Sequence, residues 1–152
     1  MKRSRNYGIN DDGFTLIEVV AVLLIVGIIS AIAIAKMTDT STYDLASQME
    51  VVKAHLRLAQ SRAMGSSSLW GINFATSTTY YLFQGNGSTT PVQFLGEDNA
   101  TVNLATKRSG LSISSAPQRI TFDAYGSPGT TTVTVTTNGG NITVTKNTGF
   151  IP

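Results

Sequence analysis

A long apolar run near the N-terminus dominates the hydrophobic pattern of the chain. Residues 19–35 contain no charge, and aliphatic side chains fill nearly every position. Together with the apolar residues just before Glu18, this run would form a helix about 30 Å long, which matches the hydrocarbon thickness of a bilayer. The basic residues Lys2, Arg3 and Arg5 precede it, and such charges hold an N-terminus in the cytoplasm. We therefore predict a membrane-spanning helix that sends the rest of the chain outward.

A second helical pattern follows the apolar run. Beyond residue 42, apolar side chains recur three or four positions apart, and the pattern ends at Gly65. This spacing predicts an amphipathic helix over residues 37–65, which would continue the membrane helix and pack on a globular domain. We expect one continuous helix over residues 14–64. Its apolar stripe would consist of Leu45, Met49, Val52, Leu56, Ala59 and Ala63.

The composition changes after residue 65, where Thr, Ser, Gly and Asn dominate and short alternating runs appear. Val133 and Val135 alternate with threonines, and Asn138-Gly139-Gly140 predicts a tight hairpin turn. The predicted fold class is α+β, with a long N-terminal membrane-spanning helix packed on a small antiparallel β-sheet domain over residues 66–152. The predicted strands are residues 69–75, 79–84, 91–95, 111–114, 119–123, 132–136 and 141–146.

One carboxylate interrupts the start of the apolar run. Glu18 lies at the edge of the predicted membrane helix, where an ionisable group is costly and usually functional. A secretory signal peptide or a plain single-span anchor would also account for the apolar run. Neither alternative explains Glu18, and residues 36–39 do not have the pattern of a signal-peptide cleavage site.

The segment Gly13-Phe14-Thr15-Leu16-Ile17-Glu18 lies between a short basic leader and an aliphatic helix. It resembles the N-terminus of type IV pilins and of the pseudopilins of type II secretion. In that family, a membrane-bound prepilin peptidase cuts after the glycine and methylates the new N-terminal residue. The resemblance implies a leader peptide over residues 1–13, cleavage between Gly13 and Phe14, and N-methylation of Phe14. It also implies that residues 14–36 form a transmembrane segment used in assembly.

The resemblance assigns Glu18 a role in assembly. After cleavage, the cationic amine of Phe14 on an incoming subunit would pair with Glu18 of a neighbour already in the filament. Such a pair is much stronger in a low dielectric than in water, and an unpaired Glu18 would be penalised there. The alternative is that Glu18 stays solvated at the lipid headgroups, where the dipole of the helix N-terminus favours it.

The C-terminal half carries a narrower resemblance. Residues 119–129, the threonine-rich hairpin and the terminal Gly149-Phe150-Ile151 are similar to the domain shared by H-type minor pseudopilins and FimT-type minor pilins. The helix end at residues 58–63 is similar to the same family. In FimT-type pilins that bind DNA the tail is rich in arginine, whereas residues 146–152 carry a single charge, on Lys146. This departure counts against DNA uptake.

The charge balance also argues against nucleic acid as a partner. The net charge is +2, and removal of the leader would leave 8 basic and 7 acidic side chains. Nucleic acid is held by clustered cations, and the one adjacent pair outside the helices, Lys107-Arg108, is more simply a solvated loop. The aromatic residues Tyr80, Tyr81 and Phe83 could stack on a base, but their place in a predicted strand favours packing in the core.

Few residues could support catalysis. The chain has one histidine, His55, and no cysteine, which excludes Cys/His metal sites and thiol nucleophiles. We expect His55 to be a polar residue on a helix face. Glu97-Asp98 could bind calcium together with loop carbonyls, but an adjacent acidic pair in such a loop is usually solvated. We predict no enzymatic activity, no cofactor and no metal site.

The sequence therefore predicts a structural subunit of a type IV pilus-like filament or a type II secretion pseudopilus. Its partners would be other pilin or pseudopilin subunits, prepilin peptidase, the inner-membrane assembly platform and, before assembly, membrane lipid. It would sit in the bacterial inner membrane with its N-terminus in the cytoplasm, and then in a periplasmic pseudopilus or an extracellular pilus. The alternatives are a DNA-binding competence minor pilin and a membrane-anchored β-domain binding module, which would not be processed at Gly13. Major and minor subunit roles both stay open.

Overall fold

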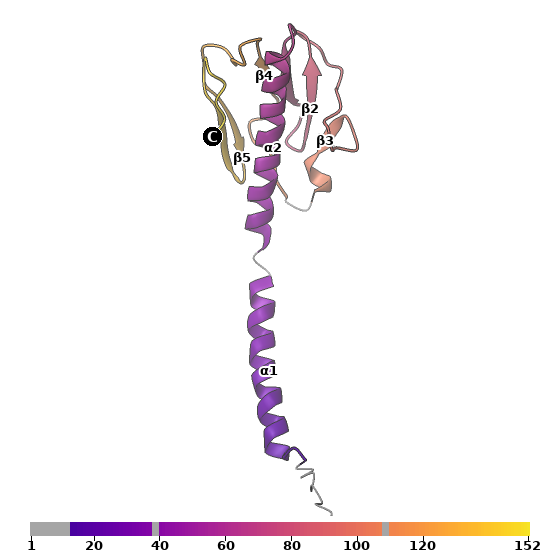
Figure 1. Ribbon diagram of the computed structural model, residues 1–152, viewed down its shortest axis with the longest axis vertical. Helices are drawn as coiled ribbons and strands as arrows, with labels where there is room; N and C mark the ends of the chain where they lie inside the picture. Colours follow the sequence, from indigo (N-terminus) through magenta and orange to yellow (C-terminus); the bar gives the residue numbers. More distant parts are fainter. Residues whose placement is uncertain (1–12, 38–39, 108–109) are drawn as a thin grey trace, which may run out of the picture. The chain divides into compact units, whose positions relative to one another are not determined.

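The computed structural model describes residues 13–37, 40–107 and 110–152. The chain forms two compact units, Met1–Asp39 and Thr40–Pro152. Helix α1, Leu16–Met37, belongs to the first unit, and helix α2, Thr40–Met64, opens the second (Figure 1). The predicted helix over residues 14–64 begins at Leu16 rather than at Phe14. Its continuity depends on residues 38–39, which lie outside the described residues.

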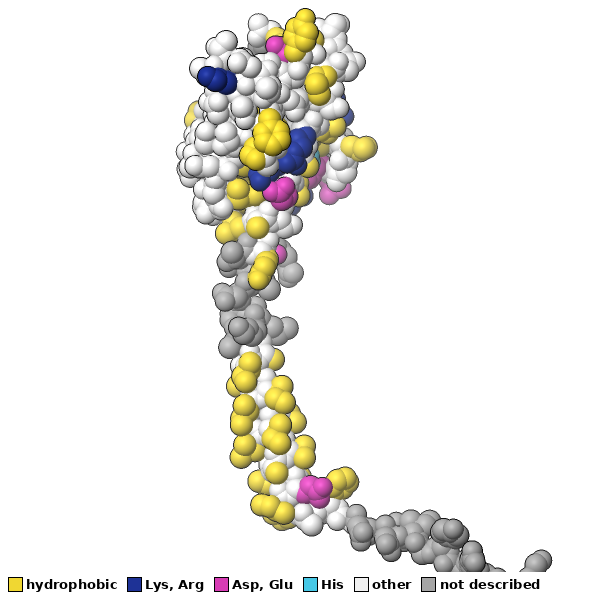
Figure 2. Space-filling model, turned by 60° about the vertical axis from the view of Figure 1, so that its left-hand side comes forward, with side chains coloured by type: hydrophobic (Ala, Val, Ile, Leu, Met, Phe, Trp, Pro, Cys, Tyr) yellow, Lys and Arg dark blue, Asp and Glu magenta, His cyan; other side chains and the backbone are white. Residues whose placement is uncertain are grey.

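Helix α1 is apolar on all sides beyond its first turn and before its last residues. The segment Leu16–Ile34 is long and apolar enough to cross a membrane, with a mean hydropathy of 2.9, and none of it is buried within the structure. Figure 2 shows hydrophobic side chains along the length of this helix. Its hydroxyl group is satisfied internally, because Ser30 Oγ donates to the carbonyl oxygen of Val26 at 2.7 Å. The helix can therefore enter lipid without an unpaired hydroxyl.

The apolar stripe predicted for α2 is confirmed. Val52, Leu56, Ala59 and Ala63 are fully buried, and Leu45 and Met49 pack partly buried against the same core. The helix ends at Met64 because Gly65 follows, and the hydroxyl of Ser66 satisfies the free carbonyl oxygen of Arg62 at 2.8 Å.

A four-stranded antiparallel sheet lies against α2, in the strand order β3-β2-β1-β4 (Figure 1). Within this sheet, strands β1 and β4 make the main contacts with α2. The α+β class with an antiparallel sheet is confirmed. The strands are β1, Trp70–Phe74; β2, Thr79–Gln84; β3, Thr101–Asn103; and β4, Gln118–Phe122.

A two-stranded hairpin completes the second unit. Strands β5, Val133–Thr137, and β6, Gly140–Val144, pair in antiparallel register with Thr137 opposite Gly140. The predicted turn at Asn138-Gly139 is confirmed. The core of the unit joins α2 to the inner face of both sheets. Its strand residues include Ile72, Phe74, Tyr80, Leu82, Ile120, Phe122, Val135, Ile142 and Val144.

Two of the predicted strands are reduced to single bridges, and one strand was not predicted. Residues 91–95 pair only where Val92 meets Leu82, and residues 111–114 only where Ile113 meets Thr137. The unpredicted strand is β3, which has three residues and is followed by the 3₁₀ turn η1, Leu104–Thr106. The side chain of Asn103 caps this turn by accepting from the Ala105 amide at 3.0 Å.

Of the three aromatic residues predicted to pack in the core, Tyr80 and Phe83 are fully buried. Phe83 lies outside the main core cluster, because alternation along β2 places it on the opposite face of the sheet. There its ring crosses Gly71, where no Cβ would fit, and lies 3.5 Å from the Arg119 guanidinium carbon. Tyr81 is half-buried and accepts a hydrogen bond from Asn73 Nδ2 at 2.8 Å.

The last residues fold back as a C-terminal hook, which we define as residues 145–151. Thr145 and Phe150 pair through their backbones, and Arg57 of α2 donates to the Ile151 carbonyl oxygen at 3.2 Å. Gln60 Nε2 lies 2.9 Å from the Gly126 carbonyl oxygen and 3.1 Å from that of Gly149. The side-chain amide of Gln60 thus joins α2 to the loop at Gly126 and to the hook at Gly149, which are distant in sequence.

The hook predicts a steric difference between two glycines with similar backbone angles. Gly149 has φ of 63° and Gly87 has φ of 72°, but a Cβ at Gly149 would collide with the Gly126 carbonyl oxygen, whereas a Cβ at Gly87 meets nothing. We expect Gly149→Ala to lower the free energy of unfolding by about 1–3 kcal/mol more than Gly87→Ala. Urea unfolding of the full chain in detergent micelles, followed through Trp70 fluorescence, measures both. Equal losses would contradict the packing described for the hook.

Candidate processing and assembly site at the start of α1

The N-terminal motif spans the boundary between extended chain and helix. Residues 13–15 are not helical, and α1 begins at Leu16. The amide of Glu18 donates to the Thr15 carbonyl oxygen at 3.1 Å and lies 3.3 Å from Thr15 Oγ1. Thr15 is therefore the N-cap of α1, a position that threonine favours because its hydroxyl satisfies a free amide of the first turn.

The role of Thr15 was not predicted, although the sequence contains its signal. Thr15-Leu16-Ile17-Glu18 has the Ser/Thr-x-x-Glu spacing of a capping box directly before an apolar run. In the described part of the chain, only the amide half of the box is formed. The Glu18 carboxylate makes no hydrogen bond or ion pair with any described residue.

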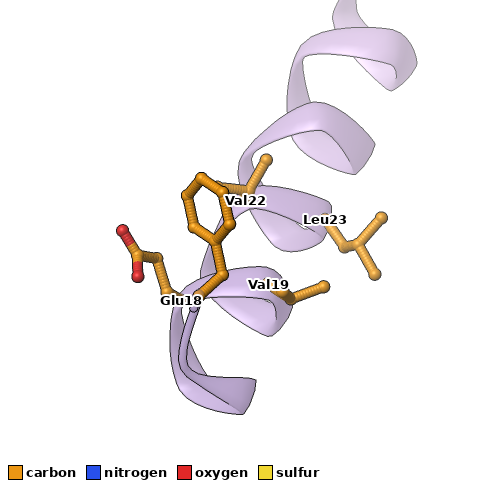
Figure 3. A pocket seen from close by; sticks show the side chains of 5 residues that line it. Glu18, Val19, Val22 and Leu23 are labelled. Atoms are coloured by element: carbon orange, nitrogen blue, oxygen red, sulfur yellow. The ribbon is translucent and has the colours of Figure 1, made fainter. Parts of the chain in front are cut away.

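Phe14 and Glu18 border the same open hollow. It measures about 250 Å³, and its other lining residues are Val19, Val22 and Leu23. Figure 3 shows that the Glu18 side chain points away from Val19 and Leu23. Phe14 is 83% exposed, and a Cβ at Gly13 would meet no atom within 4 Å. The two predicted assembly residues thus lie together, next to an accessible Gly13–Phe14 bond.

Glu18 lies in the first turn of α1. A carboxylate in the first turn of a helix lies near the positive end of the helix dipole. The other residues that border the hollow are apolar, and the Glu18 carboxylate is directed away from Val19 and Leu23 (Figure 3). The carboxylate therefore faces outward from this helix, where a group of another chain could reach it.

The prediction for His55 is wrong. His55 is only 8% exposed, and its ring stacks on Phe94 with centroids 4.0 Å apart. Its Nδ1 lies 2.9 Å from the Tyr80 hydroxyl oxygen. Burial lowers the pKa of His55; the charge of Glu97 opposes this effect and that of Lys107 adds to it. Burial likewise raises the pKa of Tyr80, so this pair is neutral and belongs to the core.

The charged loop residues contact each other. Lys107 Nζ lies 3.0 Å from a Glu97 carboxylate oxygen, so Lys107 is not a free cation for nucleic acid. Its sequence neighbour Arg108 lies outside the described residues. Among the residues that the structure describes, no group of three His, Cys, Asp or Glu side chains comes together as a metal site would require.

Comparison with known families identifies the N-terminal segment. The family described as the prokaryotic N-terminal methylation motif matches residues 10–34, which include Gly13, Phe14, Glu18 and most of α1. Neither the curated proteins nor the solved structures contain a match to this chain. The motif supports the type IV pilin and pseudopilin family in general and indicates a type IV pilin-like precursor that prepilin peptidase processes.

The fold agrees with this class. An apolar N-terminal helix, a second helix and an antiparallel sheet form an α+β layout typical of type IV pilins. The family is structural rather than enzymatic, and its motif implies assembly with other pilin subunits. The apolar helix and the motif together are consistent with anchoring in a membrane.

The buried histidine predicts a pH dependence of stability. The pKa of His55 in the folded chain lies below its ordinary value of 6.5, so the unfolded chain binds more protons near this pH. The contribution of neutral His55 to the free energy of unfolding is complete above pH 6.5, and it is lost as the pH falls through the folded-state pKa of His55. We expect the free energy of unfolding to fall from pH 7 toward pH 5, and His55→Gln to reduce this slope. Equal slopes for parent and variant in urea unfolding would contradict the burial of His55.

Proposed function

We propose that this protein is a structural subunit of a type IV pilus-like filament or a type II secretion pseudopilus. Prepilin peptidase cuts it between Gly13 and Phe14, and Phe14 is then N-methylated. The new N-terminus enters a bundle of like helices, where its amine pairs with Glu18 of a neighbouring subunit. The observation that carries this proposal is the methylation motif at the start of an exposed apolar helix, with Phe14 and Glu18 beside one hollow.

The exposed surface of α1 supports assembly through this helix. The apolar side chains of Leu16–Ile34 are all exposed within the structure. Lipid covers them before assembly and neighbouring helices cover them afterwards. Because lipid tails are as apolar as leucine, this exchange gains little from the hydrophobic effect, and packing and polar contacts decide it. A pair between an amine and the Glu18 carboxylate is such a contact.

The second unit faces outward from the membrane and forms the surface of the filament. Its resemblance at residues 119–129 and 149–151 favours a minor subunit of the H-type or FimT-type. The ion pair of Lys107 with Glu97 and the single charge of the tail favour a structural role over DNA binding. Its assembly would start at the inner membrane and lead to a periplasmic or extracellular filament.

Processing at Gly13 is the first test of this function. In cells that make prepilin peptidase, the intact mass should correspond to loss of residues 1–13 and gain of one methyl group. Gly13→Val should block cleavage, because the glycine borders the bond that is cut. Gly27→Val is the matched control, since a Cβ at either glycine meets no atom within 4 Å, and it should be processed normally. A parent chain that keeps its leader in the presence of the peptidase would refute the proposal.

Loss of the Glu18 charge should stop assembly after processing. Removing one partner of a desolvated charge pair typically costs about 3–5 kcal/mol. We therefore expect Glu18→Gln to lower incorporation into sheared filaments by at least about tenfold while leaving cleavage intact. Glu50→Gln is the control, because it removes an exposed carboxylate of α2 that pairs with Lys53 at 2.8 Å. Normal incorporation of Glu18→Gln would exclude the proposed pair.

A further inference from the structure

We propose that Thr15 is a positioning residue for processing, an inference that rests on the proposed function. Its hydroxyl caps α1 at Leu16 and so keeps the Gly13–Phe14 peptide bond outside the helix. A peptidase can then bind this bond in an extended conformation. The role of Thr15 is thus to fix where α1 begins, relative to the bond that is cut.

The geometry of the first turn carries this proposal. The Glu18 amide meets both oxygens of Thr15, with the carbonyl oxygen at 3.1 Å and Oγ1 at 3.3 Å. The Val19 amide donates to the same carbonyl oxygen at 3.2 Å. Gly13, Phe14 and Thr15 itself are non-helical and exposed. The helix therefore starts two residues after the Gly13–Phe14 bond.

A competing helix start exists in the sequence. Asp12 is also a residue type that caps helices, and it precedes the predicted cleavage bond. A helix capped by Asp12 would include Gly13 and Phe14 in its first turn. The carbonyl oxygens of that turn would be bonded within the helix, so the bond would have to unwind before a peptidase could cut it. Thr15 favours the later start by satisfying the Glu18 amide.

The size of the effect follows from the strength of a cap. Replacing a threonine cap by an apolar residue typically costs about 1 kcal/mol, which corresponds to about a fivefold change in an equilibrium. Thr15→Val keeps the shape of the side chain and removes the acceptor oxygen. Thr15→Ser keeps the acceptor. Ser30→Ala removes a hydroxyl within α1 that donates to the Val26 carbonyl oxygen, and it serves as the matched control.

The test measures kcat/KM for cleavage of the full chain by prepilin peptidase in detergent micelles. We expect Thr15→Val to lower kcat/KM, by at most about fivefold, and Thr15→Ser and Ser30→Ala to match the parent chain. Adding Asp12→Ala to Thr15→Val should restore cleavage, because the competing cap is then gone. Asp12→Ala alone provides the reference for this rescue.

A second measurement tests the same idea without the peptidase. Backbone chemical shifts of isotope-labelled chain in micelles should move toward helical values at Phe14 in Thr15→Val, relative to extended values in the parent chain. Unchanged shifts, or cleavage of Thr15→Val at the parent rate, would overturn the role of Thr15 while leaving the proposed function standing. A parent chain that is not cut would overturn the proposed function, and the role of Thr15 with it.

Discussion

The apolar surface of α1 must be covered by something other than water, and the behaviour of the whole chain depends on this constraint. Every large hydrophobic side chain from Leu16 to Ile34 is exposed within the structure. The helix satisfies its own backbone and its Ser30 hydroxyl, so it is equally suited to lipid and to a bundle of similar helices. A helix of this kind can move between the two environments at small cost.

The apolar surface does not distinguish lipid from a bundle of helices, so specific assembly must depend on the polar groups at one end of the helix. Glu18 is the only charged group in the first turn of α1, and its carboxylate has no partner among the described residues. In lipid headgroups it is solvated, whereas inside a bundle it needs a cation. A free amine at Phe14 would supply this cation only after the leader is removed. Under the proposed function, cleavage would therefore have to precede assembly.

The second unit obtains its stability without disulfide bonds, since the chain has no cysteine. The stripe of α2 fills the core against β1 and β4, and polar contacts from the same helix hold the C-terminal hook through Arg57 and Gln60. The buried pair of His55 and Tyr80 adds a polar contact within the core. A single helix thus organises both the core and the last residues of the chain.

The spacing of apolar residues along the sequence predicted those helices and strands that are long enough to show a repeat. The stripe of α2, the α+β class and the turn at Asn138-Gly139 are examples. Strand β3 was missed because three residues at a sheet edge cannot show alternation. His55 lies at helical spacing between Val52 and Ala59 of the buried stripe, and alternation along β2 separates Phe83 from Tyr80, so the sequence carried a signal for both positions. Their partners Phe94 and Arg119 come from distant segments and had no local signal. At the candidate site, the motif identified Gly13, Phe14 and Glu18 as candidates, whereas the cap at Thr15 was overlooked.

The most direct test of the account is zero-length carbodiimide cross-linking of sheared filaments, followed by mass spectrometry of the cross-linked peptides. The account predicts an amide bond between the Phe14 amine of one subunit and the Glu18 carboxylate of another. Filaments that contain this chain but give no such bond, while other carboxylate–amine pairs do react, would contradict it.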